Sequence, residues 1–209
     1  MKLRPEHIER LEKFLDRIQE DAYLELPSQI HESITEQMIE RICKDLAPQK
    51  DCLVLDVGFG RGYAMGIFHE MGFRAIGITN NQEEIKACKN KEIDIRLMDQ
   101  SFLEFQDDYF DLIWCRHTLE HSIFPYFTLA GFHRVLKPGG LIYVEVPAPD
   151  TSSRHEKNEN HYSVLPLSGW TELVKRSGFQ ITSSLTIETR TVIGPDAYFS
   201  LTAKKCTRN

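Results

Sequence analysis

The chain has 209 residues, enough for one α/β domain with a substantial core and too few for two ordinary domains. Apolar residues make up 41% and charged residues 27%, which is the balance of a soluble globular protein. The net charge of −6, with lysine and arginine scattered along the chain, disfavours DNA or RNA as a partner. No apolar run approaches the roughly 20 residues that a membrane span needs.

Five cysteines are present, and none stands in a C-x-x-C pair. An odd number without that spacing argues against a disulfide framework and against a structural zinc site. The N-terminus is dense in charges of both signs and lacks the apolar segment of a secretory signal. These features predict reduced thiols in a cytoplasmic protein.

Residues 1–50 are predicted to form an N-terminal helical cap. Ile30, Ile34, Met38, Ile42 and Leu46 recur every four residues, which places them on one face of a helix. An earlier helix is expected over residues 7–20, with four apolar side chains facing inward. These are Ile8, Leu11, Leu15 and Ile18.

From residue 51 the pattern predicts a single α/β domain that continues to residue 209. Apolar runs at 52–55, 75–78, 93–98, 110–115 and 141–146 read as strands, because buried parallel strands are nearly continuous in apolar residues. Helices are expected to end at Gly72 and to cover 82–89 and 124–136, and residues 137–140 are expected to form a turn. Strands that alternate with helices indicate a doubly wound, mostly parallel sheet.

The last part of the chain breaks this alternation. A polar loop at 147–166 and a helix near 167–177 precede two β-rich stretches, 179–188 and 198–203. Residues 194–196, Gly-Pro-Asp, are expected to form the turn between them. So short a connection cannot carry a parallel crossover, so the final strand should be antiparallel.

A glycine-rich loop, Asp56-Val-Gly58-Phe-Gly60-Arg-Gly62, follows the first predicted strand and opens a helix. This places backbone N–H groups and a helix N-terminus at the edge of the sheet where ligands bind. The spacing G-x-G-x-G differs from the G-x-G-x-x-G of dinucleotide sites, and the Gly-Lys-Ser/Thr of a phosphate loop is absent. A ligand with an amino-acid tail and a nucleoside fits this loop better, although a tight turn without a ligand is the simpler alternative.

Three motifs resemble those of class I S-adenosylmethionine-dependent methyltransferases of the small-molecule branch. They occur in the order and spacing of that family, between residues 53 and 146. They are Leu53-Val-Leu-Asp-Val-Gly-Phe-Gly-Arg-Gly62, Phe110-Asp-Leu-Ile-Trp-Cys-Arg-His-Thr-Leu-Glu-His121 and Arg134-Val-Leu-Lys-Pro-Gly-Gly140. The resemblance implies a Rossmann-like, seven-stranded sheet and S-adenosyl-L-methionine as the cofactor.

The resemblance also assigns roles to individual residues. Gly58, Gly60 and Gly62 would line the methionine part of the cofactor, and Asp56 would organise the loop toward its ammonium. The cofactor's adenine would be held at the end of the third strand, and its methionine part at the end of the fourth. The residues concerned are Asp99 and Gln100, then Cys115 and Arg116.

One departure from the family pattern concerns the ribose. The family usually carries an acidic residue at the end of the second strand, whereas Thr79 stands there in this chain. Thr79 and Asn80 are therefore the predicted ribose ligands. A hydroxyl or an amide bonds a ribose without the assistance of a charge.

Histidines cluster after the fourth predicted strand. His117-x-x-Glu120-His121 matches a zinc-protease pattern, but that pattern needs a helix and a third ligand from another element, so no metal is expected. Histidine titrates in the range that suits a general base, and a methyl transfer to a hydroxyl needs one. The candidates are His117, His121, His155 and His161. For each of them, a structural role in packing or in anchoring a loop is the alternative.

The sequence thus predicts a methyltransferase for a small polar acceptor, such as a sugar or a glycosylated metabolite. The polar loop at 147–166 favours a hydroxylated or charged acceptor, because it follows the fifth strand and so lies at the ligand edge of the sheet. A non-catalytic S-adenosylmethionine-binding module, acting as a partner or regulator, is the second hypothesis. A dinucleotide oxidoreductase is disfavoured by the glycine spacing.

Overall fold

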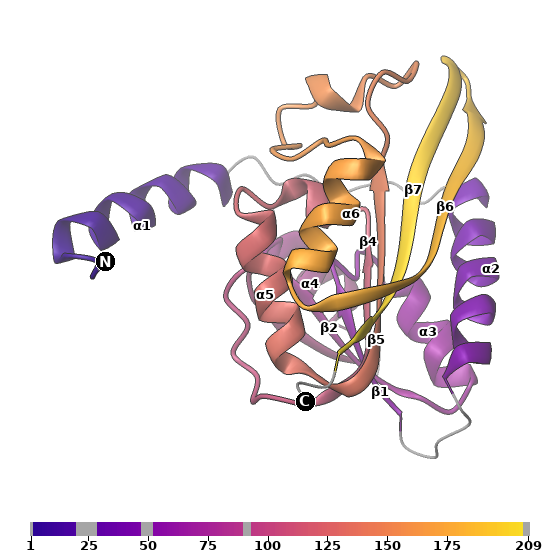
Figure 1. The fold of residues 1–209 in the computed structure, drawn as a ribbon, viewed down its shortest axis with the longest axis horizontal. Coiled ribbons are helices and arrows are strands. Elements are labelled where there is room, and N and C mark those ends of the chain that lie inside the picture. Colours follow the sequence, from indigo (N-terminus) through magenta and orange to yellow (C-terminus); the bar gives the residue numbers. More distant parts are fainter. Residues whose placement is uncertain (1, 20–28, 47–51, 90–92, 207–209) are drawn as a thin grey trace.

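The structure is a computed structural model that describes residues 2–19, 29–46, 52–89 and 93–206. Figure 1 shows a central sheet with helices packed on both of its faces. The helices of the described residues are α1 (Pro5–Gln19), α2 (Gln29–Asp45), α3 (Tyr63–Glu70), α4 (Gln82–Cys88), α5 (Pro125–Val135) and α6 (Leu167–Arg176), with two short 3-10 helices, η1 (Leu119–His121) and η2 (His155–Lys157). The strands are β1 (Leu53–Val57), β2 (Arg74–Thr79), β3 (Asp94–Leu97), β4 (Phe110–Arg116), β5 (Leu136–Pro147), β6 (Phe179–Thr191) and β7 (Gly194–Lys205).

The strands form one seven-stranded sheet in the order β3-β2-β1-β4-β5-β7-β6. The first five strands are parallel, and β7 runs antiparallel to both of its neighbours. The predicted sheet and its antiparallel last strand are therefore confirmed. The strand order reverses between β1 and β4, which is the point where open α/β sheets bind ligands at the carboxyl ends of their strands.

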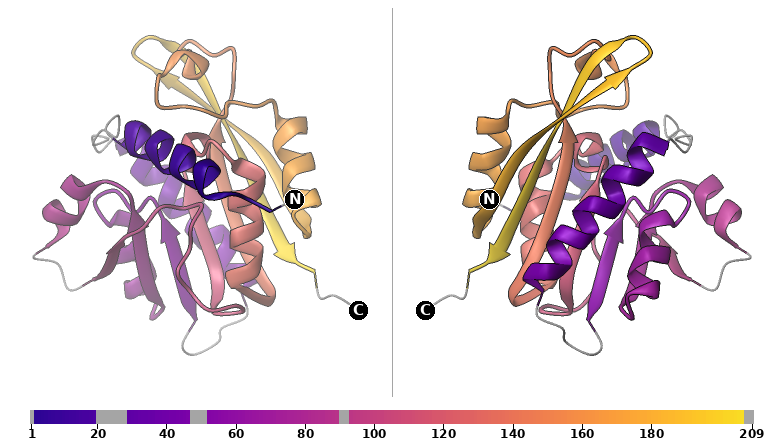
Figure 2. Two further views of the ribbon diagram at one scale, coloured as in Figure 1. Left: turned by 90° about the vertical axis from the view of Figure 1, so that its left-hand side faces the viewer. Right: turned by 90° about the vertical axis from the view of Figure 1, so that its right-hand side faces the viewer.

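The core consists of two apolar layers, one on each face of the sheet, because successive side chains of a strand point to opposite faces. Leu55 of β1 belongs to the layer that includes Phe132 of α5 and Trp170 of α6. Its neighbour Val54 belongs to the opposite layer, with α2 and with Phe68 of α3. Figure 2 shows these helices on the two sides of the sheet. Both layers hold the parallel strands in register, so that the ends of β1 to β4 meet at one edge.

The N-terminal helices are less buried than their periodicity predicts. Ile8 of α1 is 44% exposed, so the inward orientation predicted for it is wrong, and Ile30 of α2 is 49% exposed. Helix α1 projects from the body in Figure 1, whereas Ile39 and Ile42 anchor α2 in the core. An apolar periodicity identifies a helix face but not what covers it. Glu20 and the predicted boundary between residues 50 and 51 lie outside the described residues.

The predicted turn at residues 137–140 is wrong, because these residues belong to β5. Leu136 pairs with Phe110 and Leu141 pairs with Leu112, so the strand contains a bulge at this point. Gly139 has a φ of +78°, a backbone conformation that glycine adopts without strain. The glycines therefore bend a continuous strand instead of ending it.

The predicted turn at residues 194–196 is also wrong. Both hairpin strands are longer than expected, and Val192 and Ile193 alone connect them. Pro195 lies in β7 opposite Arg190, beyond the last residue of β7 that pairs with β5. A proline is tolerated there because one side of the strand has no ladder to complete. None of the helices in the described ranges is long and apolar enough to cross a membrane.

Candidate active site

A cavity of about 170 Å³ opens at the carboxyl ends of β1, β2, β3 and β4. It therefore lies at the reversal of the strand order. Its walls come from the loops that follow these four strands, from α1 and from the loop after β5. The polar lining residues used below are Thr79, Asn80, Glu84, Asp99, Gln100, Arg116, His117, Thr118, His121 and Asn160.

The three glycines of the loop after β1 have positive φ values, and their surroundings differ. Gly58 lines the cavity and lies against Thr118, where a Cβ would overlap the hydroxyl and stand 2.7 Å from Cγ2. Gly60 also lines the cavity, and a Cβ there would meet nothing within 4 Å. Gly62 precedes α3 and lies outside the cavity lining, against Ile93. Gly60 is thus the position where the backbone is open to a ligand, whereas Gly58 accommodates Thr118.

Asp56 lies at the end of β1, behind the cavity wall. Its side chain is buried, and Oδ2 has no hydrogen-bond partner among the described residues. Burial, together with the negative charge of Glu84, raises the pKa of Asp56 to about 8. A positively charged group in the cavity would stabilise this carboxylate and lower its pKa.

The end of β2 presents polar atoms, as predicted, and an additional acid. Thr79 is buried, and its Oγ1 accepts a hydrogen bond from the N–H of Asn81 at 3.0 Å, so the Thr79 hydroxyl can still donate. Asn80 is exposed at the cavity rim. Asn81 caps α4 by accepting from the N–H of Glu83, and this brings Glu84, on the first turn of α4, to the cavity wall. Glu84 was not predicted, because it lies on the first turn of α4 and not at the strand end.

The end of β3 supplies Asp99 and Gln100, as predicted. Asp99 Oδ1 accepts from the N–H of Ser101 at 2.7 Å, which fixes the carboxylate at the cavity wall. Gln100 donates through Nε2 to the carbonyl of Thr118 at 2.8 Å. Its Oε1 is buried and has no hydrogen-bond partner among the described residues, so it can accept from a bound group.

At the end of β4 the two predicted residues, Cys115 and Arg116, have side chains on opposite faces of the sheet. Cys115 is fully buried in the core and does not line the cavity, and burial raises the pKa of its thiol well above the usual value. Arg116 points to the opposite face and lines the cavity. Its Nε lies 2.8 Å from Oε1 of Glu145, a fully buried residue of β5 that the sequence analysis also missed. A glutamate inside the apolar run 141–146 was the available signal.

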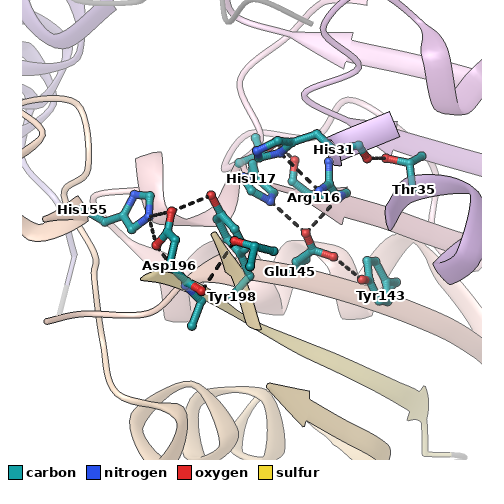
Figure 3. Close-up of polar contacts among 12 residues, drawn as sticks. His31, Thr35, Arg116, His117, Tyr143, Glu145, His155, Asp196 and Tyr198 are labelled. Atoms are coloured by element: carbon teal, nitrogen blue, oxygen red, sulfur yellow. Dashed lines mark hydrogen bonds and ion pairs between the residues drawn. The ribbon is translucent and has the colours of Figure 1, made fainter. Parts of the chain in front are cut away.

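Glu145 is the centre of a buried polar network behind the cavity-lining residues Arg116 and His117, drawn in Figure 3. His117 Nε2 lies 2.8 Å from Glu145 Oε1, and Tyr143 donates its hydroxyl to Oε2. Burial alone would raise the pKa of Glu145, but the hydrogen bond from His117 and the charge of Arg116 bring it to about 2. Burial and Arg116 lower the pKa of His117 to about 4, so its imidazole is neutral near pH 7.

The four predicted histidines fall into two groups. His117 and His121 line the cavity. His155 and His161 lie outside its lining, in the loop after β5. His155 Nε2 lies 3.0 Å from Oδ1 of Asp196 in β7, and this contact anchors the loop. The His155 ring stacks on the His161 ring, with 5.7 Å between the ring centroids.

Comparisons with known proteins agree with this geometry. Residues 55–144 match the sequence model of the methyltransferase domain family. The chain is 32% identical over 124 residues to malonyl-[acyl-carrier protein] O-methyltransferase 1 of Coxiella burnetii, covering 58% of this chain and 42% of that protein. The chain thus spans less than half the length of this relative.

Solved structures share the fold. A methyltransferase of Archaeoglobus fulgidus, described as dependent on S-adenosylmethionine, has a TM-score of 0.63 and 21% identity, over 82% of this chain and 94% of that one. The [4+2]-cyclase SpnF has a TM-score of 0.71 and 19% identity, over 85% of this chain and 81% of that one. The second similarity shows that a protein with this fold can carry a different function.

The residues at the cavity fit S-adenosylmethionine, which presents an ammonium group, ribose hydroxyls and an adenine amino group. Asp56 offers a buried carboxylate oxygen, and Gln100 a buried amide oxygen, each without a hydrogen-bond partner among the described residues. Glu84 brings a carboxylate to the wall beside Thr79, and Gly60 leaves its backbone open. Together with the strand order and the match of residues 55–144 to the methyltransferase domain family, these features make the chain similar to the class I S-adenosylmethionine-dependent methyltransferases.

Proposed function

We propose that the protein transfers a methyl group from S-adenosylmethionine to a hydroxyl of a small polar molecule, such as a sugar or a glycosylated metabolite. The observation that carries this proposal is the pairing of His117 with Glu145 at the wall of the cofactor cavity. The fold alone does not support it, because SpnF shares the fold under another name. When bound, S-adenosylmethionine supplies an electrophilic methyl group on a sulfonium.

His117 is the best placed of the four histidines to act as a base. A carboxylate only accepts hydrogen bonds, so Nε2 of His117 carries the proton in the bond to Glu145 and Nδ1 holds the lone pair. Glu145 thereby sets the tautomer and the ring orientation. Arg116 keeps Glu145 ionised from the other side. Nδ1 can then accept the proton of an acceptor hydroxyl as the oxygen is methylated.

The other predicted histidines have partners that suggest supporting roles. His155 is engaged by Asp196 and holds the loop after β5 in place. Asn160 and Tyr162 of that loop line the cavity, so the loop contributes to acceptor binding. Helix α1 adds Leu15 and Ile18 to the lining, and we propose that residues 1–50 cap the cofactor. The net charge of −6 supports a small molecule over a nucleic acid as substrate. The five free cysteines suit the reducing cytoplasm.

A carboxylate acceptor is a second candidate, since the Coxiella relative is named for a malonyl group. A carboxylate is already ionised near pH 7 and needs no base. The two candidates therefore differ in their dependence on His117.

The test is the release of S-adenosylhomocysteine from S-adenosylmethionine over panels of hydroxylated metabolites and of acyl carboxylates. With a hydroxyl acceptor, His117→Gln should lower kcat by about 100-fold. With a carboxylate acceptor it should have little effect on kcat. His69→Gln, an exposed residue of α3, is the matched control. Calorimetric binding of S-adenosylmethionine without turnover on either panel would favour the non-catalytic module.

A further inference from the structure

Glu120, His121 and His161 come together beside the cofactor cavity. One potential ligand atom from each residue lies within 4.8 Å of the other two. Glu120 and His121 belong to η1, directly after β4, whereas His161 comes from the loop after β5. Residues 40 positions apart thus converge because β4 and β5 are neighbouring strands.

This cluster supplies what the His117-x-x-Glu120-His121 pattern lacks by itself. The pattern needs a third ligand from another element, and His161 is in that place. His117 takes no part, because its Nε2 is bonded to Glu145. The residues of the pattern therefore belong to two sites. His117 is the proposed base at the cavity wall, whereas Glu120 and His121 form a separate group with His161.

The hydrogen bonds of the two histidines fix which ring nitrogen carries the lone pair that a metal ion would need. His121 Nδ1 lies 2.8 Å from the carbonyl of Asn160, which only accepts, so Nδ1 is the donor and Nε2 holds the lone pair. A backbone carbonyl that orients a histidine in this way is typical of the surroundings of metal ligands. The amide nitrogen of Asn158 lies 3.3 Å from Nε2 of His161 and donates to its lone pair, so a metal ion at this atom would replace the Asn158 hydrogen bond.

The burial and composition of the cluster favour a transition metal. Glu120 is only 1% exposed, and its carboxylate adds an anionic oxygen to the two imidazoles. Imidazole suits zinc, iron, cobalt and nickel, whereas magnesium and calcium prefer oxygen ligands alone. Three protein ligands leave at least one coordination position open. His121 and Asn160 both line the cofactor cavity, so an open position there is accessible to a bound molecule.

We propose that Glu120, His121 and His161 bind a divalent first-row transition metal, of which Zn²⁺ is the example to test. The proposal differs from the expectation from sequence that no metal binds this segment. Metal binding is independent of methyl transfer. If the proposed function holds as well, the metal would bind an oxygen of the acceptor and lower the pKa of its hydroxyl.

The experiment is titration of the metal-stripped full chain, without an affinity tag, with Zn²⁺ by calorimetry and with Co²⁺ by visible absorption. The expected result is one tight equivalent of Zn²⁺ and the absorption bands of a nitrogen- and oxygen-coordinated Co²⁺ site. His121→Gln and His161→Gln should each weaken Zn²⁺ binding by at least about tenfold. His69→Gln, on the exposed face of α3, should bind as the wild type does.

Two results would overturn the proposal: no stoichiometric binding, or binding that both histidine substitutions leave unchanged. Glu120 is buried, so Glu120→Gln is informative only if its circular dichroism and thermal midpoint match the wild type. The loop substitution His161→Gln keeps the test valid if the Glu120 variant does not fold. Because the readout is metal affinity, a chain that binds Zn²⁺ but transfers no methyl group would refute the proposed function and not the site.

Discussion

His117 Nε2 lies 2.8 Å from Oε1 of Glu145, so a histidine just past the end of β4 is held by a buried carboxylate on the neighbouring strand β5. The backbone of His117 has a φ of +53°, which a non-glycine residue adopts at an energetic cost. The hydrogen bond compensates for this conformation and directs the ring to the cavity wall. The pair therefore links the stability of the sheet to the chemistry of the site.

We expect Glu145→Gln to destabilise the protein by about 3–5 kcal/mol, because it leaves the Arg116 side chain, which is only 12% exposed, without its carboxylate. Urea denaturation measures the change. Glu9→Gln, which removes the exposed ion pair with Lys13, is the control and should leave the midpoint unchanged. If Glu145→Gln lowers the free energy of unfolding no more than the control does, the ion pair between Arg116 and Glu145 contributes little to stability.

The pH profile of the reaction tests the base. Arg116 of β4, Glu145 of β5, His31 of α2 and the Tyr198 ring of β7 surround His117. Burial and Arg116 lower the pKa of His117 to about 4, so its neutral form predominates above that pH. With a hydroxyl acceptor, kcat should rise with pH through about 4 and level off above it. An inflection near the ordinary histidine value of about 6.5 would assign the base to another group.

Glu84 should contribute to cofactor affinity, since it supplies a carboxylate near the position where family members carry an acid. We expect Glu84→Gln to weaken S-adenosylmethionine binding by about tenfold or more, because a hydrogen bond to a charged group contributes about 1.5–3 kcal/mol. Calorimetry measures the affinity. Its neighbour Glu83 pairs with Lys86 on the surface, and Glu83→Gln is the control. Equal S-adenosylmethionine affinities in the two variants would contradict a role for Glu84 and would indicate that Thr79 and Asn80 alone bind the ribose.

The glycines of the loop should differ in their tolerance of a methyl group. Gly58→Ala should lower stability by about 2–3 kcal/mol, because its Cβ overlaps Thr118 and its φ is +72°. Gly60→Ala meets no neighbour and should affect stability less but reduce cofactor affinity. Thermal unfolding and calorimetry separate these effects. Adding Thr118→Ala should restore part of the stability of Gly58→Ala, and no recovery would contradict the steric explanation.

Much of the fold follows from local sequence patterns. Apolar runs and their spacing predicted the strands, because a strand buried on both faces tolerates few polar residues. The shortness of the last connection predicted the antiparallel β7, since chain geometry forbids a parallel crossover there. The two turn predictions failed at residues 137–140 and 194–196, where glycine and proline stand within strands. These residues permit a turn, but strand pairing decides whether one forms.

The residues of the site were likewise predicted from the sequence only in part. By itself the sequence determined the glycine loop, the cofactor class and the residues that end each strand, since these depend on a strand and the turn that follows it. The tertiary structure decided which distant residues come together: Glu145 with His117, and Glu120 with His161. Such pairs join segments far apart in the chain. Their contact depends on strand order and register, which arise from packing of the whole sheet and leave no local pattern in the sequence.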